Sequence, residues 1–448
     1  MKEAWLYLSK GDIETERLQC TQEGKDLSAL EDEFERVMSL DLDDLRNQPA
    51  AQALLDRTAE LRARPDFPYS EPSDLDGIRK ARPADRPVLP ALGLSTDELR
   101  DKAYGAWVGR VAGCLLGKPI EGWRRPQLWG YLKDTGRFPL STYITRQAPA
   151  DVLERHRVPE GRCYIETVTE MPEDDDTNYT TTGLAILKRH GPGFTPNDVA
   201  RFWMSDIPIL HVCTAERTAY RNLVLLIPPP LSASTRNPYR EWIGAQIRAD
   251  FWGYANPGNP QRAAEFAWRD ACISHVKNGI YGEMWAAAMI AAAFVVDGVP
   301  TAIRAGLGEI PVRCRLADDI RKVLTWHADG VGYDDAIERI HEQWDEARAH
   351  DWCHTISNAM IVSAGLLWGE GRFGDTVARA VQPCFDTDCN GATAGSVIGI
   401  LLGAREIPRE WTSVFNDTLT TGVAGFHRVR LCDMADETLQ AIEAVAAS

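Results

Sequence analysis

Two segments of this chain carry a glycine at every fourth position, and this repeat restricts how they can fold. The glycines are Gly105, Gly109, Gly113 and Gly117 in one segment, and Gly391, Gly395, Gly399 and Gly403 in the other. A step of four residues turns an α-helix by about 400°, so each set forms one slowly drifting stripe. Glycine inside a helix costs about 1 kcal/mol relative to alanine, so four of them need a compensating close approach of another backbone. The repeat therefore predicts two tightly packed, buried helices.

Acidic residues stand at the ends of both glycine segments. Asp386 and Asp388 come directly before the second stripe, and Glu121 follows the first. We predict that the two glycine helices pack against each other in the core and bring these three carboxylates to one site. The alternative is two ordinary core helices whose ends are unrelated.

A second acidic cluster, at residues 173–176, reads Glu-Asp-Asp-Asp and leads into another helical apolar pattern. Carboxylates at a helix start can cap free N–H groups and complement the helix dipole. Four adjacent acids exceed that need and repel one another, and a bound cation offsets the repulsion. Taken with Asp386 and Asp388, the cluster favours a hard divalent metal such as Mg²⁺ or Mn²⁺ held by oxygen ligands.

Composition limits the class of partner. The net charge of −16 argues against nucleic acid and against anionic membrane surfaces. The longest apolar run, residues 284–296, is shorter than the ~20 residues that span a bilayer. Ten cysteines occur without a CxxC pair, which favours reduced thiols and a cytoplasmic location.

Periodicity divides the chain into three parts and predicts a mostly α-helical fold. Residues 1–64 predict a small helical appendage, six prolines make 65–94 a linker without helix or strand, and 95–448 form the main domain. Within the main domain, residues 123–170 have poor periodicity and predict an irregular insertion. Capping-box patterns that predict helix starts are Ser28 with Glu31 and Ser95 with Glu98.

Four segments resemble signature segments of the ADP-ribosylglycohydrolase family, of the type of dinitrogenase reductase-activating glycohydrolase. They are GAWVGRVAGCLLGKPIEG (105–122), MPEDDDTNYT (171–180), HVKNGIYGEM (275–284) and FDTDCNGATAGSVIGILLGA (385–404). The resemblance extends over about residues 96–430, in the order of the family. It implies an all-α, orthogonal multi-helix bundle with a two-metal centre in a central cleft.

The resemblance also implies site residues. The implied metal ligands are Asp174, Asp175, Asp176, Asp386, Asp388 and Cys389. The implied catalytic residues are Glu121, Asp175 and Asp388, and a ribose-side loop is implied at His275, Asn278 and Gly279. Family members often have Thr or Ser at the position of Asp174, Thr at that of Cys389 and Asp at that of Cys114.

Further substrate-binding candidates are weaker. Tyr281 could stack on a base, with core packing as the alternative. His354 lies in DWCHTISNAM, which resembles a family segment before the last helices, with a hydrogen-bonded structural role as the alternative. Candidates for contacting a pyrophosphate, again with structural roles as the alternative, are Arg236, Arg240 and Arg248.

These patterns predict a metal-dependent hydrolase that releases ADP-ribose from a modified protein or a small conjugate. The first alternative keeps the same centre and acts on another N- or O-riboside, such as a nucleoside. The second is a non-catalytic descendant that binds nucleotides or a partner protein. The complete set of acids argues against this second alternative, because a drifted site would be expected to lose some of them.

Overall fold

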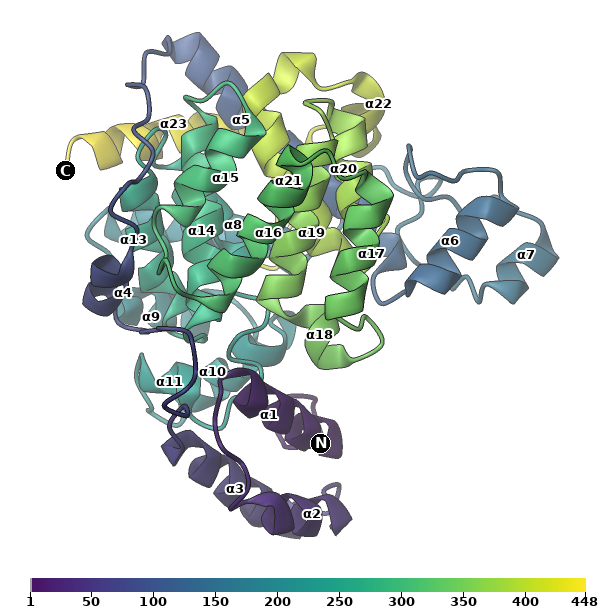
Figure 1. The fold of residues 1–448 in the computed structure, drawn as a ribbon. Helices are drawn as coiled ribbons and strands as arrows, with labels where there is room; N and C mark the ends of the chain where they lie inside the picture. Colours follow the sequence, from purple (N-terminus) through teal and green to yellow (C-terminus); the bar gives the residue numbers. More distant parts are fainter. Residues whose placement is uncertain (1) are drawn as a thin grey trace.

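The computed structural model describes residues 2–448, which fold almost entirely into α-helices (Figure 1). The all-α class and the multi-helix bundle are confirmed. The helices of the body are α5 (Thr96–Gly117), α6 (Arg125–Asp134), α7 (Ala150–Arg155), α8 (Asp175–His190), α9 (Pro196–Asp206), α10 (Thr214–Val224), α11 (Leu231–Ser234), α12 (Asp250–Tyr254), α13 (Pro260–Ala271), α14 (Asn278–Ala293), α15 (Val299–Leu307), α16 (Arg315–Ala328), α17 (Tyr333–Gln343), α18 (Ala349–Cys353), α19 (Thr355–Trp368), α20 (Phe373–Val381), α21 (Thr387–Leu402), α22 (Arg409–Thr412) and α23 (Leu431–Ala446).

Short elements complete the body. The 3₁₀-helices are η2 (Lys118–Ile120), η3 (Ile209–His211), η4 (Gln246–Arg248), η5 (Ala404–Glu406) and η6 (Ser413–Phe415). The strands β1 (Thr418–Thr420) and β2 (Arg428–Arg430) pair antiparallel, with Leu419 opposite Val429. Within residues 2–448, none of the helices combines the length and the apolar character that crossing a bilayer requires.

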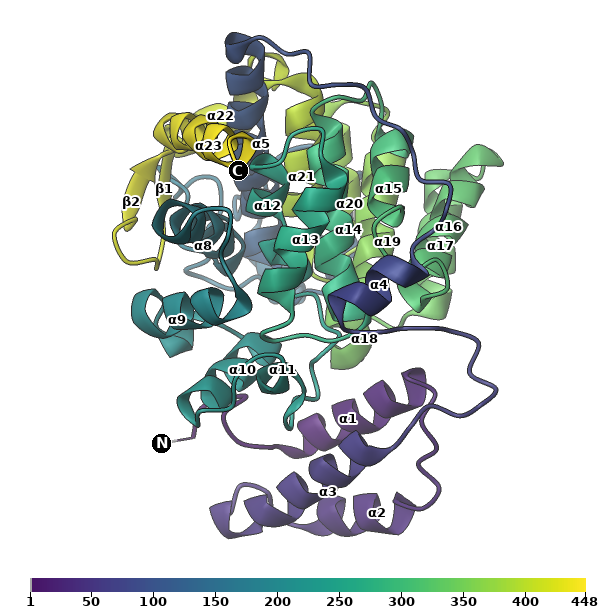
Figure 2. The ribbon, with the colours of Figure 1, turned by 90° about the vertical axis from the view of Figure 1, so that its left-hand side faces the viewer.

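The first sixty residues form a small helical unit with an apolar core of its own (Figures 1 and 2). Its elements are α1 (Lys10–Gln22), α2 (Glu31–Ser39), η1 (Leu45–Asn47) and α3 (Gln48–Glu60). Buried Ile13, Phe34 and Leu54 belong to this core, which is separate from the large core of the body. The capping box at Ser28 is wrong: the Ser28 N–H donates to Asp26, and the N-cap of α2 is Leu30, which makes no side-chain capping hydrogen bond.

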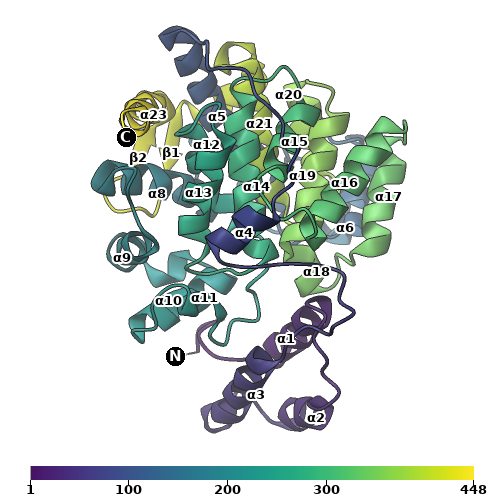
Figure 3. The ribbon, with the colours of Figure 1, turned by 60° about the vertical axis from the view of Figure 1, so that its left-hand side comes forward.

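The proline-rich segment contains a helix that the sequence does not predict. α4 (Leu75–Ala81) forms in the proline-free interval between Pro72 and Pro83. The Asp74 carboxylate caps it by accepting from the Gly77 N–H at 2.7 Å. Ile78 is fully buried in the large core, so α4 is held against the body (Figure 3). The prolines prevent helix formation only at their own positions. In the interval between them, burial of the Ile78 side chain holds α4 against the body.

Residues 123–170 project from one side of the body in Figure 1. Two helices, α6 and α7, interrupt the segment for which the sequence predicts no regular structure. The remaining stretches are turns and extended backbone. The Pro126 ring in the first turn of α6 occupies a position where its missing N–H costs nothing, which is why a proline starts this helix instead of breaking it.

The two glycine stripes face each other along the antiparallel helices α5 and α21. A Cβ atom built on Gly109 would lie 2.2 Å from the carbonyl oxygen of Gly395, and one on Gly113 would lie 1.9 Å from that of Gly391. Both distances are far below van der Waals contact, so only glycine permits this approach. The predicted packing of the two helices is confirmed, and the capping box of Ser95 with Glu98 at the start of α5 is also present.

Candidate metal centre and active site

The acidic residues stand at the helix ends that this packing brings together. Glu121 follows η2 directly after α5, Asp174 is the N-cap of α8, and Asp386 is the N-cap of α21. Asp174 accepts a hydrogen bond from the N–H of Asp176 at 2.9 Å, as expected for a capping carboxylate. The Asp386 side chain makes no capping hydrogen bond, and its Oδ2 instead accepts from the Cys353 thiol at 3.8 Å.

The start of α21 is fixed by its neighbours. Thr387 donates its hydroxyl to the Gly117 carbonyl at 3.0 Å, which ties α21 to the end of α5. The side-chain oxygen of Asn358, on α19, accepts from the N–H of Asp386 at 3.1 Å and from the Asn390 amide at 2.8 Å. The loop that carries the second acidic cluster is therefore held rigidly from two sides.

Three groups of possible ligand atoms form at these helix ends, each with its atoms within 4.8 Å of one another. The groups are Cys114 with Asp174 and Asp176, Asp176 with Asp388 and Cys389, and Glu121 with Asp386 and Asp388. Asp176 and Asp388 each belong to two groups, so the three groups are contiguous. Five of the predicted metal ligands are in these groups, together with the predicted catalytic residue Glu121 and the unpredicted Cys114.

The sixth predicted ligand, Asp175, lines a cavity of about 140 Å³ next to these groups. Residues around the cavity include Glu121, Asp386, Asp388 and Cys389. The acids from mid-chain and from near the C-terminus therefore meet at one hollow. Whether they bind metal or act in catalysis stays a prediction.

Burial and mutual repulsion raise the pKa values of these carboxyls. The pKa of Asp175 rises to about 8, from burial and from the charges of Asp174 and Asp388. The pKa of Asp388 also rises to about 8, from burial and from Glu121 and Asp174. Burial and the charges of Asp175 and Asp174 raise the pKa of Glu121 to about 7. The carboxylates can lose their protons together only when a compensating positive charge is present.

Two cations of the protein, one half-buried and one fully buried, supply part of that charge. Burial opposes ionisation of Asp174, but the Lys118 ammonium, 2.6 Å away, lowers its pKa below the usual value. The fully buried Arg110 guanidinium on α5 contacts Asp176 at 2.9 Å and Asp250 at 2.8 Å. α5 therefore carries both the glycine stripe and Arg110, and Lys118, the residue that caps its C-terminal end, supplies the second cation beside the first acidic cluster.

The donor set fits hard divalent cations with one softer edge. Within residues 2–448, Asp176 Oδ2 and Asp388 Oδ1 are buried and make no hydrogen bond to the protein. A buried carboxylate oxygen without a partner is costly, and coordination to a cation removes that cost. Carboxylate oxygens suit Mg²⁺ or Mn²⁺, whereas the thiols of Cys389 and Cys114 would favour a softer metal.

Comparison with known families identifies the chain. The model of a family described as ADP-ribosylglycohydrolase matches residues 95–447. The protein belongs to the ADP-ribosylglycohydrolase family. A solved structure titled "ADP-ribosylglycohydrolase-related protein complex" is also similar, with 18% sequence identity and a TM-score of 0.41, over 78% of this chain and 99% of that one. A search of curated proteins finds no match.

Sequence reasoning missed several residues at the candidate site of this family member. Lys118 stands three residues before Glu121 in the same signature segment, so its proximity could have been found. Glu216 lines the cavity from α10, and burial raises its pKa to about 7, although Arg248 lies 2.6 Å away. Trp5 and Trp352 also line the cavity; Trp352 lies in DWCHTISNAM, the segment quoted for His354, whereas no motif marks Trp5.

The predicted substrate-binding residues lie elsewhere in the family member's fold. Of the residues that line the cavity in the described chain, none is His275, Asn278, Gly279, Tyr281 or His354. Asn278 donates to Glu71 at 2.8 Å, and the Tyr281 hydroxyl donates to the Pro72 carbonyl. His275 is buried against Ser274, with Nδ1 2.8 Å from the hydroxyl. A Cβ on Gly279 would lie 2.6 Å from the Arg240 carbonyl oxygen. These contacts hold the proline-rich segment and the loop before α14.

His354 likewise has structural contacts. Its Nδ1 accepts from the Ile356 N–H at 3.2 Å and caps α19, and its ring stacks on Trp344 with centroids 5.0 Å apart. Glu241 lies 3.5 Å from the other ring nitrogen. The part of these five residues in substrate binding stays a prediction that the cavity does not support.

The three arginines considered for a pyrophosphate are engaged in ion pairs. Arg236 pairs with Asp56 at 2.7 Å, Arg240 with Glu16 at 2.6 Å, and Arg248 with Glu216 at 2.6 Å. Arg240 and Arg248 are buried, so their alternative structural roles fit the observed contacts.

Proposed function

We propose that the protein is a divalent-metal-dependent glycoside hydrolase. Its reaction is cleavage of the C1 glycosidic bond of the ribosyl group in an ADP-ribosylated protein or a small ADP-ribose conjugate. The observation that carries this proposal is the convergence of Glu121, Asp175 and Asp388 on one small cavity beside unpartnered carboxylate oxygens. Membership of the ADP-ribosylglycohydrolase family supports hydrolysis of a glycosidic bond in general.

The metal ligands in this proposal are the two acidic clusters. Asp174, Asp175 and Asp176 would come from the start of α8, and Asp386, Asp388 and Cys389 from the start of α21. The contiguous ligand groups that share Asp176 and Asp388 support two adjacent Mg²⁺ or Mn²⁺ ions. When bound, such ions hold the ribose hydroxyls and lower the pKa of bound water.

The protein's own groups would handle the protons. Glu121, with a pKa of about 7, can hold or release a proton near neutral pH, as general acid–base catalysis requires. It would protonate the leaving atom as the bond to C1 breaks, or take the proton of the water whose oxygen forms the new bond to C1. The surrounding carboxylates stabilise the positive charge that develops on the ribosyl ring.

The size of the cavity supports a second candidate. About 140 Å³ is well below the roughly 300–1,000 Å³ of typical ligand pockets, so this cavity suits a ribosyl group better than a whole ADP-ribose. A hydrolase of another N- or O-riboside, such as a nucleoside, uses the same carboxylates in the same roles. The non-catalytic alternative has no observation of its own in its favour.

Metal titration and a substrate panel test the proposal. We expect calorimetry to show Mn²⁺ or Mg²⁺ binding that Asp388→Asn abolishes while the circular dichroism spectrum is kept. Incubation with ADP-ribosylated peptide, O-acetyl-ADP-ribose and nucleosides, followed by mass spectrometry, identifies the leaving group. Glu121→Gln should lower kcat at least 100-fold with metal affinity kept, because it removes only the proton carrier.

The matched control is Glu342→Gln, which makes the same change at an exposed position. It should leave metal binding and kcat unchanged. Turnover in excess chelator, or normal kcat in Glu121→Gln, would remove the metal or Glu121 from the mechanism. Metal binding without turnover of any substrate in the panel would favour the non-catalytic alternative.

A further inference from the structure

Among the residues that line the catalytic cavity in the described chain, Trp5 alone comes from the segment before α5. It precedes α1 and lies outside the matched family region, which begins at residue 95. Across the same cavity stand Glu121, Asp175 and Asp388. The start of the described chain lies beside α10 in the three ribbon views (Figures 1, 2 and 3). A segment outside the matched family region therefore lines the same cavity as the acids of the matched region.

Specific contacts hold Trp5 in place. The Arg217 guanidinium on α10 lies over the indole ring, 4.7 Å from its centroid, and donates to the Ala4 carbonyl at 3.3 Å. The Thr218 hydroxyl donates to the carbonyl of Trp5 itself at 3.3 Å. Arg217 is in turn fixed by the Val212 carbonyl at 2.8 Å. α10 also carries Glu216 into the cavity, so one helix positions both a buried carboxyl and the indole.

The backbone at Trp5 is strained. The φ of Trp5 is 64°, in the left-handed region, which residues with bulky side chains rarely adopt. Such a conformation persists only where the surroundings over-determine it. Here the cation over the ring and the two hydrogen bonds to the backbone supply that constraint. The strain is therefore associated with placing the indole, since a relaxed backbone would direct the side chain elsewhere.

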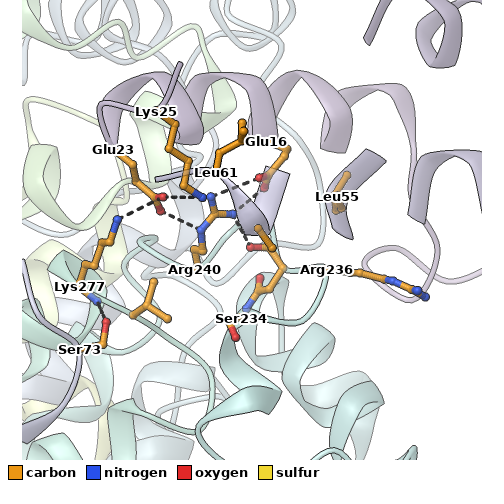
Figure 4. Close-up of a pocket in the computed structure, with 13 residues that line it drawn as sticks. Glu16, Glu23, Lys25, Leu55, Leu61, Ser73, Ser234, Arg236, Arg240 and Lys277 are labelled. Atoms are coloured by element: carbon orange, nitrogen blue, oxygen red, sulfur yellow. Dashed lines mark hydrogen bonds and ion pairs between the residues drawn. The ribbon is translucent and has the colours of Figure 1, made fainter. Parts of the chain in front are cut away.

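The helical unit behind Trp5 is firmly attached to the body. Figure 4 shows the Arg240 guanidinium between two carboxylates of the unit, at 2.6 Å from Glu16 and 2.9 Å from Glu23. Lys277 of the body reaches Glu23 at 3.3 Å, and Lys25 of the unit reaches it at 3.1 Å. Most of these groups are buried, and removing one partner of a buried pair leaves an uncompensated charge. The helical unit therefore anchors the segment that carries Trp5 to the body.

We propose that Trp5 is a specificity-determining residue. Its indole forms a wall of the catalytic cavity. This wall admits compact ribosides and disfavours ADP-ribose that is attached to a protein. This inference rests on the second candidate function, hydrolysis of a small N- or O-riboside, for the identity of the substrate, and the position of the wall can be tested without it. The second aromatic residue of the cavity, Trp352, gives the hollow an apolar boundary suited to a small planar leaving group.

Cysteines that line the cavity can report how readily a reagent enters it. Cys213, Cys353 and Cys389 line it, and Cys432, which does not, serves as the internal reference. The full-length protein and the graded series Trp5→Phe, Trp5→Leu and Trp5→Ala are treated with methyl methanethiosulfonate or with a bulky maleimide. Peptide mass spectrometry then gives the labelling rate of each cysteine relative to Cys432.

We expect maleimide labelling of the cavity cysteines to rise at least tenfold in Trp5→Ala, by less in Trp5→Leu and little in Trp5→Phe. The small reagent should discriminate much less between the variants. Leu45→Ala, an exposed change in the same helical unit, is the matched control and should match the wild type. Unchanged maleimide labelling rates of the cavity cysteines in a folded Trp5→Ala or Trp5→Leu protein would refute the proposal that the indole forms a wall of the cavity.

Selectivity is measured by calorimetry with ribose 5-phosphate and ADP-ribose in the presence of Mg²⁺. The ratio of the two Kd values should shift at least tenfold toward ADP-ribose in Trp5→Ala. If the wall is present and this ratio is unchanged, Trp5 does not determine specificity. If maleimide labelling responds and neither ligand binds the wild type, the wall stands and the proposed ribosyl substrate is wrong.

Discussion

Replacement of Gly113 by alanine tests the link between the glycine stripes and the acidic site. In an ordinary helix this change stabilises by about 1 kcal/mol. Here the new Cβ would lie 1.9 Å from the Gly391 carbonyl oxygen and 2.4 Å from its carbon. To restore an ordinary C···O contact of about 3.3 Å, α5 and α21 must separate by about 1.4 Å. Both helices are buried at this point, and the atoms that the new Cβ would meet belong to the backbone, so no side chain can move aside to relieve the contact.

Two consequences follow from that separation. Overpacking in a dense core costs about 1–3 kcal/mol, and with backbone on both sides we expect about 3 kcal/mol, or a Tm lower by about 3 °C. The separation also moves Asp388 away from Glu121 by a distance several times the roughly 0.2 Å that metal coordination tolerates. We therefore expect the affinity for Mn²⁺ to fall at least tenfold.

Differential scanning fluorimetry and calorimetry with Mn²⁺ measure both effects. Gly11→Ala in α1 is the matched control, because a Cβ there would meet only the Ser9 hydroxyl oxygen, at 3.7 Å. It should leave Mn²⁺ affinity unchanged and keep or slightly raise the Tm. A Gly113→Ala protein with the wild-type Tm and the wild-type Mn²⁺ affinity would refute the argument that close backbone approach positions the acids.

Two further predictions concern the ligands themselves. The pKa values of Glu121 (about 7) and Asp388 (about 8) are raised above their unfolded values, so the metal-free protein should be most stable at low pH within its folding range and lose stability as pH rises through 7 to 8. Added Mg²⁺ should raise the Tm more at pH 8.5 than at pH 6, and an equal increase at both would contradict the raised pKa values. If Cys389 contributes its thiol to the centre, Cys389→Thr should lower the affinity for Cd²⁺ relative to Mg²⁺ at least tenfold in calorimetry. An unchanged ratio would mean that the sulfur is not a ligand.

Local sequence patterns were sufficient for the helices that surround the site. The step of four residues between glycines predicted both α5 and α21, and the carboxylates at the starts of α8 and α21 predict where a cation could bind. The packing of the two helices against each other was also predicted, because a helix that carries so many glycines needs a second backbone against it, but the register that puts Gly113 against Gly391 comes from the structure. Tyr281 and the rest of the loop at 275–281 show the limit. A segment of the right composition stands next to Glu71 and Pro72 of the proline-rich segment, away from the cavity.

What the sequence determined by itself is therefore the local conformation and the chemistry of the acids, since periodicity and capping act within one or two helical turns. The tertiary structure decided which distant side chains complete the site: the Lys118 ammonium beside Asp174, Glu216 from α10, and the Trp5 indole across the cavity. These placements depend on burial and charge compensation summed over segments up to several hundred residues apart. A short segment of sequence does not contain these long-range contributions, which is why no sequence motif predicts the position of Trp5.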